Sequence, residues 1–192
     1  MTIDTHRLPA AADSIAPVGP HLAPSFCLLL LVASCALASF ALACATPFAA
    51  FAVLAAAILP LPSALPVIGA AWIVNQAIGF TWLHYPLDVS TALWGLVIGL
   101  AALTATLTSN IVLRLLSRYA TAIGFAVGLL GAYTTYELVL FAATPFLGGA
   151  SSFTAKIILR LCLLNAIWLI GLVAVCVALT LLRKFRQERA FS

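Results

Sequence analysis

The chain is apolar over almost its whole length, and polar positions interrupt it only at intervals. Charged residues nearly vanish from about position 24 to position 182 and then return together. A helix of roughly 20 apolar residues is long enough to cross a bilayer, so this stretch has room for about six spans. The apolar runs are continuous and show no alternation of period two, which argues against a β-barrel. The pattern therefore predicts an all-α integral membrane protein, a bundle of about six transmembrane helices.

Proline, glycine and basic residues divide the apolar stretch into six predicted helices. We expect them at 25–45, 48–59, 67–83, 90–113, 120–143 and 155–182. The second is short and rich in alanine, and Pro60, Pro62 and Pro66 separate it from the third, because proline interrupts the helical hydrogen-bond ladder. We interpret it as a half-length or tilted helix.

The composition leaves no room for a soluble domain, since 65% of the 192 residues are hydrophobic and only 7% are charged. We predict a disordered N-terminal extension over 1–23, a six-helix membrane domain over 24–183 and a basic cytoplasmic tail over 184–192. The five cysteines lie within apolar runs and lack metal-type spacing, so we interpret them as small buried residues. The first apolar run continues past Cys35, and we interpret it as a span rather than a cleaved signal.

Basic residues gather at two places and predict the topology. Arg114 and Arg118 follow the fourth predicted helix, and Arg183, Lys184, Arg186 and Arg189 follow the sixth. Two helices separate these groups, so the positive-inside rule places both in the cytoplasm. We therefore expect a multi-pass protein of the bacterial inner membrane with a cytoplasmic C-terminus. The N-terminus is predicted inside, and it moves outside if the short second helix is not a crossing.

Glu137 is the only acidic residue deep in a predicted helix. An unpaired charge in lipid costs at least about 2.5 kcal/mol, so we predict that Glu137 pairs with Arg160 or with Lys156 of the next helix. Such a pair could orient two helices, or it could face an outward cavity and contact a polar ligand. Tyr133 and Tyr136 share a helical face with Glu137 and make that face unusually polar.

Two further groups are candidates for a site. Asn75 and Gln76 are adjacent amides within the third predicted helix, and they either bond between helices or line a site. His84, Tyr85 and Asp88 lie in the loop that follows, which the topology places outside. His84 is the one histidine beyond the N-terminal extension, either an ordinary loop residue or a transition-metal ligand.

Several function classes lack their residues. No predicted helix contains histidine, which excludes a bis-histidine haem within the bundle. GxSxG, HExxH and P-loop motifs are absent, so we predict neither an enzyme nor an intrinsic cofactor, and any use of ATP would require another subunit. The positive charge sits at helix ends and does not indicate a nucleic-acid partner. Because polar residues concentrate in the outer half, we expect a site open to the outside rather than a channel.

One segment of the chain resembles a known family. The stretch 71–80, followed by His84-Tyr85-Pro86 and by 91–95, is similar to the substrate-binding S components of energy-coupling factor transporters, in particular the solitary cobalamin-binding BtuM-like proteins. The resemblance implies a small membrane subunit that captures a vitamin such as cobalamin at the outer face. It implies an energising transmembrane and ATPase module as partner, docked on small residues of the first helix. It also implies His84 as axial ligand to the cobalt, because the chain has no cysteine between Cys44 and Cys162.

The expected function is thus uptake of a small solute, bound by His84, Tyr85, Asp88, Asn75, Gln76, Tyr133, Tyr136, Glu137 and Arg160. The alternative is a membrane assembly or interaction subunit that acts through helix–helix contacts. That alternative predicts that Glu137, Arg160, Asn75 and Gln76 satisfy one another with no cavity between them. Small residues at four-residue spacing, such as Gly95 and Gly99, let helices approach closely, either within the bundle or, on the first helix, against a partner.

Overall fold

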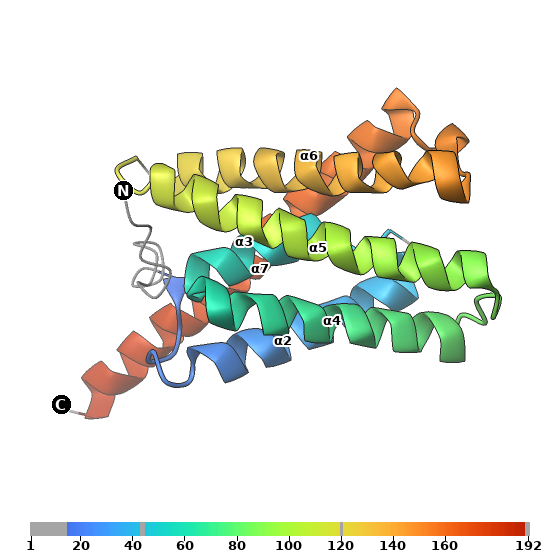
Figure 1. Ribbon diagram of the computed structural model, residues 1–192. Coiled ribbons are helices and arrows are strands. Elements are labelled where there is room, and N and C mark those ends of the chain that lie inside the picture. The colour runs from blue at the N-terminus through green and yellow to red at the C-terminus, as the bar shows by residue number, and fades with distance from the viewer. Residues whose placement is uncertain (1–14, 43–44, 120, 191–192) are drawn as a thin grey trace.

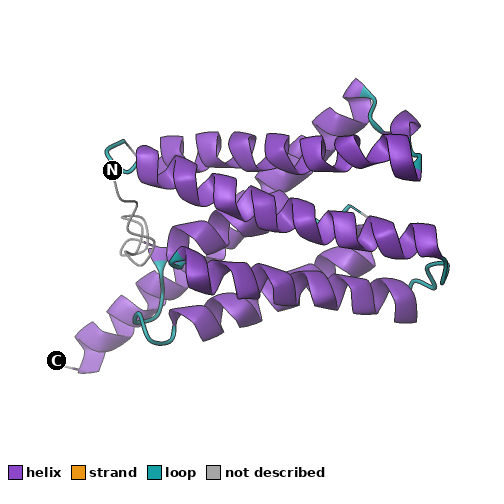
Figure 2. Ribbon diagram, viewed as in Figure 1, coloured by secondary structure: helices purple, strands orange, loops and turns teal. Residues whose placement is uncertain are grey.

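A computed structural model of the chain describes residues 15–42, 45–119 and 121–190. Within this part of the chain the regular structure is helical, without strands, which confirms the all-α fold (Figures 1 and 2). The elements are α2 (Ala23–Leu42), α3 (Phe48–Ile58), α4 (Leu61–Thr81), α5 (Val89–Leu115), α6 (Thr121–Leu147), the short 3₁₀ turn η1 (Ala150–Ser152) and α7 (Ala155–Ala190). All but α3 and η1 are long and apolar enough to cross a membrane, which is compatible with a multi-pass membrane protein.

Consecutive helices run in opposite directions, and this gives the bundle two distinct ends (Figure 1). The start of α2 and the ends of α5 and α7 lie at one end. We call it the arginine end, because it carries Arg114, Arg118, Arg183, Lys184 and Arg186. The other end, which we call the cavity end, holds the α4–α5 and α6–α7 connections. Although it is short, α3 therefore reverses the direction of the chain between α2 and α4.

The short helix α3 is the centre of the fold. All eleven of its residues are buried, and its sequence FAAFAVLAAAI is apolar on every side. A helix without a polar face is stable only inside a core. At 1.5 Å per residue it is about 16 Å long, roughly half the hydrocarbon thickness of a bilayer. It is therefore enclosed by longer helices instead of facing lipid.

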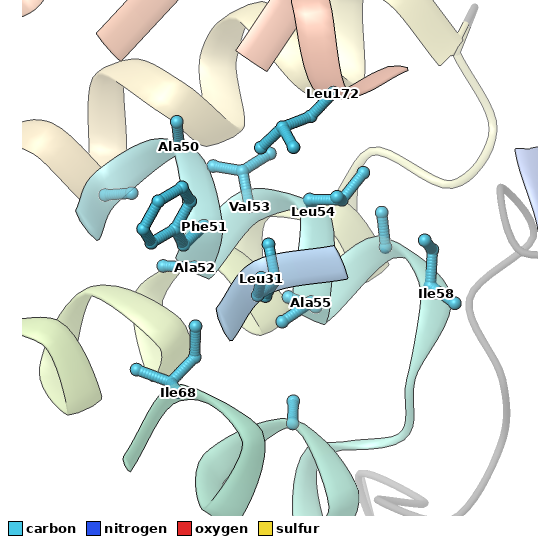
Figure 3. Close-up of a cluster of buried hydrophobic side chains, with 14 of the residues drawn as sticks. Leu31, Ala50, Phe51, Ala52, Val53, Leu54, Ala55, Ile58, Ile68 and Leu172 are labelled. Carbon is cyan, nitrogen blue, oxygen red and sulfur yellow. The ribbon is translucent and has the colours of Figure 1, made fainter. Parts of the chain in front are cut away.

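The neighbours of α3 come from every part of the bundle. Figure 3 shows Leu31 of α2, Ile68 of α4 and Leu172 of α7 grouped around its side chains. Helices α5 and α6 also pack directly on α3. Most of its residues are alanine, whose small side chain lets surrounding helices approach closely. The alanine-rich composition therefore permits five helices to share one central element.

The predicted start of the third helix was wrong by six residues. We expected a break through Pro66, whereas α4 begins at Leu61, with Pro60 as its N-cap residue and Pro62 in its first turn. The first N–H groups of any helix have no intrahelical partner, so a proline there loses no bond. Only Pro66 lies within the ladder proper, and the helix continues through it to Thr81.

The last two helices are longer than predicted. Helix α6 continues to Leu147 and includes Pro145, where we expected a loop. Proline cannot donate to the carbonyl four residues earlier, which is that of Phe141. The Thr144 hydroxyl donates to this carbonyl at 2.8 Å and replaces the missing bond. Helix α7 extends through the basic segment as far as Ala190 instead of ending at 182.

Small residues at four-residue spacing pack inside the bundle. Trp72 of α4 lies against Gly99, where an added Cβ would be 2.7 Å from its ring, and its Nε1 donates to the Gly95 carbonyl at 2.8 Å. An added Cβ on Gly95 would lie 2.4 Å from the side-chain oxygen of Gln76. The glycines of α5 thus let α4 approach, which is the internal packing role of such residues.

The segment before α2 was predicted to be disordered as far as residue 23. Residues 1–14 lie outside the described chain, and so do Ala43 and Cys44. Residues 15–22 pack at the arginine end: Ile15 is buried, and Arg183 of α7 donates a hydrogen bond to the Pro17 carbonyl. This contact places the start of α2 beside the end of α7.

Candidate functional site

A cavity of about 330 Å³ lies at the cavity end, between α5, α6, α7 and the segment that enters α3. Its volume is at the lower end of the range of about 300–1,000 Å³ that is usual for small-molecule sites. Its lining comprises Ala45, Thr46, Trp94, Ile98, Tyr133, Tyr136, Glu137, Leu140, Gly149, Ser152, Phe153, Ile157, Leu161 and Asn165.

Ala45 and Thr46, which lead into α3, form one wall of the cavity, and Asn165 of α7 both lines the cavity and bonds to the start of α3. The Asn165 Oδ1 accepts a hydrogen bond from the Ala50 N–H at 3.1 Å, and its Nδ2 donates to the Leu161 carbonyl at 2.9 Å. Asn165 is buried, so both ends of its amide are satisfied away from water. This residue caps α3 from a helix more than a hundred positions away in the sequence.

Glu137 and Tyr133 form the polar part of the α6 wall. The Tyr133 hydroxyl donates to the Ile158 carbonyl of α7 at 2.7 Å and also lies beside the Glu137 carboxyl group. A phenolic hydroxyl has a single proton. The hydroxyl is therefore shared between the Ile158 carbonyl and the Glu137 carboxyl group, and as a neutral group it supplies no positive charge to balance the carboxylate. Glu137 is half-buried and contributes the one formal charge among the lining residues.

Aromatic rings make up much of the remaining wall. Tyr136 stacks on Phe48 of α3, with ring centroids 6.4 Å apart and an interplanar angle of 28°. Phe153 packs edge-on against Phe141 at 5.3 Å. Trp94 approaches Gly149, where an added Cβ would lie 3.5 Å from the indole ring. Gly149 has a φ of 85°, a conformation that favours glycine.

The predicted pairing of Glu137 with Arg160 or Lys156 was wrong. Both cations are exposed on α7, neither lines the cavity, and neither forms an ion pair with Glu137. Residues at one depth can lie on different faces of their helices, and depth alone did not give the face.

Asn75 and Gln76 were predicted in the floor of the site, but neither belongs to the lining residues. The Asn75 Nδ2 donates to the hydroxyls of Ser39 and Thr46, each at 2.9 Å. The Gln76 Nε2 donates to the Asn75 Oδ1 at 3.1 Å. The structure therefore favours the interhelical alternative. Thr46 belongs both to this hydrogen-bond network and to the cavity lining, so the network connects Asn75 to the cavity wall.

His84, Tyr85 and Asp88 lie at the cavity end, but they do not line the cavity. His84 is exposed and has a φ of 54°. The ring of Tyr85 packs against Gly79, where a Cβ would lie 2.6 Å away, and it contacts Phe80 edge-on. Asp88 is the N-cap residue of α5 and accepts the Thr91 N–H at 2.7 Å. This hydrogen bond lowers the pKa of Asp88 from its usual value.

Sequence reasoning did not place Asn165 or Trp94 in the site. An amide within an apolar helix is a signal for function or for hydrogen bonding, so the rule that selected Asn75 could also have selected Asn165. The apolar lining residues Ile157 and Phe153 carry no such signal, because nothing in the sequence separates them from residues that face lipid.

A second hollow of about 850 Å³ lies at the arginine end, lined by Pro17, Val18, Phe26, Leu179, Leu182, Arg183, Arg186 and Gln187. It lies between the segment before α2 and the last turns of α7. Its charged lining residues, Arg183 and Arg186, belong to the arginine end. Among the described residues, no group of three histidine, cysteine or acidic side chains is arranged to hold a metal ion.

Comparisons with protein-family models, with curated proteins and with solved structures find no match to this chain. They give no support to the resemblance to S components of energy-coupling factor transporters. The function is therefore argued from the site alone.

Proposed function

We propose that the protein is a membrane subunit that binds a small solute in the cavity between α5, α6, α7 and the segment that enters α3. One observation carries the proposal: the cavity of about 330 Å³ with Glu137, Tyr133 and Asn165 in its wall. A subunit that acts only through helix contacts needs no such space, and the alternative predicted none between its polar residues. A cavity with few polar groups among apolar walls is the usual form of a small-molecule site.

The cavity favours a solute smaller than cobalamin. A corrin ring with its side chains needs a larger cavity than one at the lower end of the usual range. His84, the candidate axial ligand, is exposed and is not part of the lining. The proposal is therefore capture of a small solute, with the cavity end facing outside and the arginine end facing the cytoplasm of a bacterial inner membrane. An ATPase partner for uptake remains part of this proposal, because the sequence has no P-loop.

The test measures the reaction of a cysteine placed in the cavity. Leu140→Cys lies in the lining, and Leu138→Cys lies two residues away on the exposed surface of α6. In proteoliposomes, a small water-soluble thiol reagent is expected to label Leu140→Cys. The filtered small-molecule fraction of a cell extract is expected to slow that labelling severalfold, because a bound solute covers the position. Labelling of Leu138→Cys is expected to be unaffected by the extract.

The unmodified chain provides the blank for the reaction of its own cysteines, of which Cys27, Cys35 and Cys176 are buried in the described part of the chain. If Leu140→Cys does not react, water does not reach the cavity and the proposal fails. If it reacts at the same rate with and without the extract, no solute occupies the cavity. Either result would leave the helix-contact alternative.

A further inference from the structure

We propose that the solute is a small organic cation, such as an amine or a quaternary ammonium compound, recognised by Glu137 and by the aromatic rings around it. This inference rests on the proposed function and names the class of its substrate. It depends on the charge of the cavity wall, on the aromatic rings in that wall and on the hydrogen bonds made by the first N–H groups of α3.

The charge of the wall is negative and has no cation to balance it. Glu137 is the one charged residue among the fourteen that line the cavity. Lys156 and Arg160 of the neighbouring helix are exposed and do not pair with it. Charges within membrane helices are usually paired, because an isolated one is costly at that depth. A positively charged solute in the cavity would supply the missing partner.

The rings of the wall suit the same class of solute. Trp94, Tyr133, Tyr136 and Phe153 all line the cavity and come from α5, α6 and the connection before α7. The face of an aromatic ring attracts a cation, and cages of such rings bind quaternary ammonium groups. An anionic solute would be repelled by the Glu137 carboxylate.

The N-terminus of α3 could have favoured an anion, but the protein itself occupies most of it. Three N–H groups precede the first ladder bond, which Phe51 makes to the Pro47 carbonyl. The Phe48 N–H donates to the Thr46 carbonyl at 2.9 Å, and the Ala50 N–H donates to Asn165 at 3.1 Å. Two of these three donors are thus satisfied internally, so the start of α3 has little remaining capacity to bind an anion.

The experiment compares three probes of one shape and different charge. Choline is the cation, dimethylbutanol is its neutral isostere with carbon in place of nitrogen, and dimethylbutyrate is the matched anion. Ligand-observed NMR titrations use the full chain purified in detergent. Choline is expected to bind at least about tenfold more tightly than the neutral probe, because it gains the pair with a desolvated carboxylate. Dimethylbutyrate is expected not to bind.

Variants identify the residue and the place. Glu137→Gln is expected to remove the preference for choline. Glu137→Asp keeps the charge and is expected to retain part of that preference. Glu188→Gln removes an exposed charge at the other end of α7 and is expected to change nothing. Ile157→Trp fills the cavity from α7 and is expected to weaken choline binding. Gel filtration and thermal unfolding establish that each variant is folded.

Equal binding of the three probes, or a preference for the anion, would overturn the cation assignment. So would a preference for choline that persists in Glu137→Gln, or an absence of choline binding. The labelling of Leu140→Cys decides separately whether the proposed function stands. If the small-molecule fraction protects Leu140→Cys but choline does not bind, the assignment to organic cations is wrong and the solute site stands. Failure of both would remove both.

Discussion

Asn165 joins two helices through a single side chain. Its carbonyl oxygen accepts the Ala50 N–H at the start of α3, and its amide nitrogen donates to Leu161 within α7. Asn165 also lines the cavity, as do Ala45 and Thr46 of the segment that leads into α3. Glu137 is different at the same scale, since its carboxylate lacks a cation from the protein and is free to receive one from a ligand.

Replacing Asn165 by alanine is expected to lower the stability of the bundle. The buried Ala50 N–H would lose its acceptor, which costs about 1–3 kcal/mol, and the thermal unfolding midpoint in detergent should fall by several degrees. Thr180→Ala is the matched control on the same helix, because the Thr180 hydroxyl bonds only to the Cys176 carbonyl of its own turn. Its effect should stay within about 0.5 kcal/mol. Equal effects of the two substitutions would contradict the capping role.

Asp88 should make the stability of the loop before α5 depend on pH. The hydrogen bond from the Thr91 N–H holds the pKa of Asp88 below its unfolded value of 3.8. A depressed pKa adds stability above the unfolded value, and this stability is lost as the pH falls through the folded value. Asp88→Asn keeps a capping side chain without the charge. The unfolding midpoint of the wild type should therefore exceed that of Asp88→Asn at pH 6, and the difference should shrink below pH 4. A constant difference would contradict the assignment.

At the scale of elements, α4 and α5 depend on a close approach that two glycines permit. Trp72 bonds to the Gly95 carbonyl and lies against Gly99. Thr144 and Pro145 offer a second case, in which a hydroxyl replaces the bond that proline removes and α6 continues to the edge of the cavity. In both, local chemistry decides where a helix packs or ends.

Gly99→Ala is expected to destabilise the protein by about 1–3 kcal/mol, since the new methyl group would overlap the rigid ring of Trp72. Gly69→Ala in α4 is the control, because nothing lies within 4 Å of an added Cβ there. It should leave stability unchanged or raise it by up to about 1 kcal/mol, as alanine is the better helix former. Thermal unfolding of both variants measures the difference. A neutral Gly99→Ala would show that α4 and α5 are not in close contact.

At the scale of the whole molecule, α3 determines the topology although it is too short to span a bilayer by itself. It reverses the direction of the chain between α2 and α4, so the start of α2 and the end of α7 share the arginine end (Figure 1). The contact between Arg183 and the Pro17 carbonyl joins these two segments. The cavity then lies at the end of the bundle opposite the arginine end.

Cysteine labelling in sealed vesicles is expected to separate the two ends. Gly19→Cys and Ser117→Cys are exposed at the arginine end and should react from the same side. Leu87→Cys, in the connection before α5, should react from the opposite side. With the positive-inside rule, the first pair should be cytoplasmic. Reaction of Gly19→Cys together with Leu87→Cys would mean that α3 is not a crossing.

The hydrophobic pattern alone determined the membrane class, the six helical segments and the shortness of the second. These features are local in the sequence, because an apolar run, a proline or a group of basic residues affects only the helix that contains it or ends beside it. The same pattern located Glu137, Tyr133 and Tyr136, since a polar residue in an apolar helix is rare enough to identify.

Only the tertiary structure decided which of these residues meet. In the folded bundle Arg160 lies on an exposed face, and Asn75 donates hydrogen bonds to Ser39 and Thr46. Asn165 accepts a hydrogen bond at the start of α3. The reason is physical. Each helix can rotate about its axis without changing its apolar pattern, so the face a residue presents is decided by packing against other helices. The cavity arises from that packing, because it forms where α5, α6, α7 and the segment that enters α3 meet without filling the space between them.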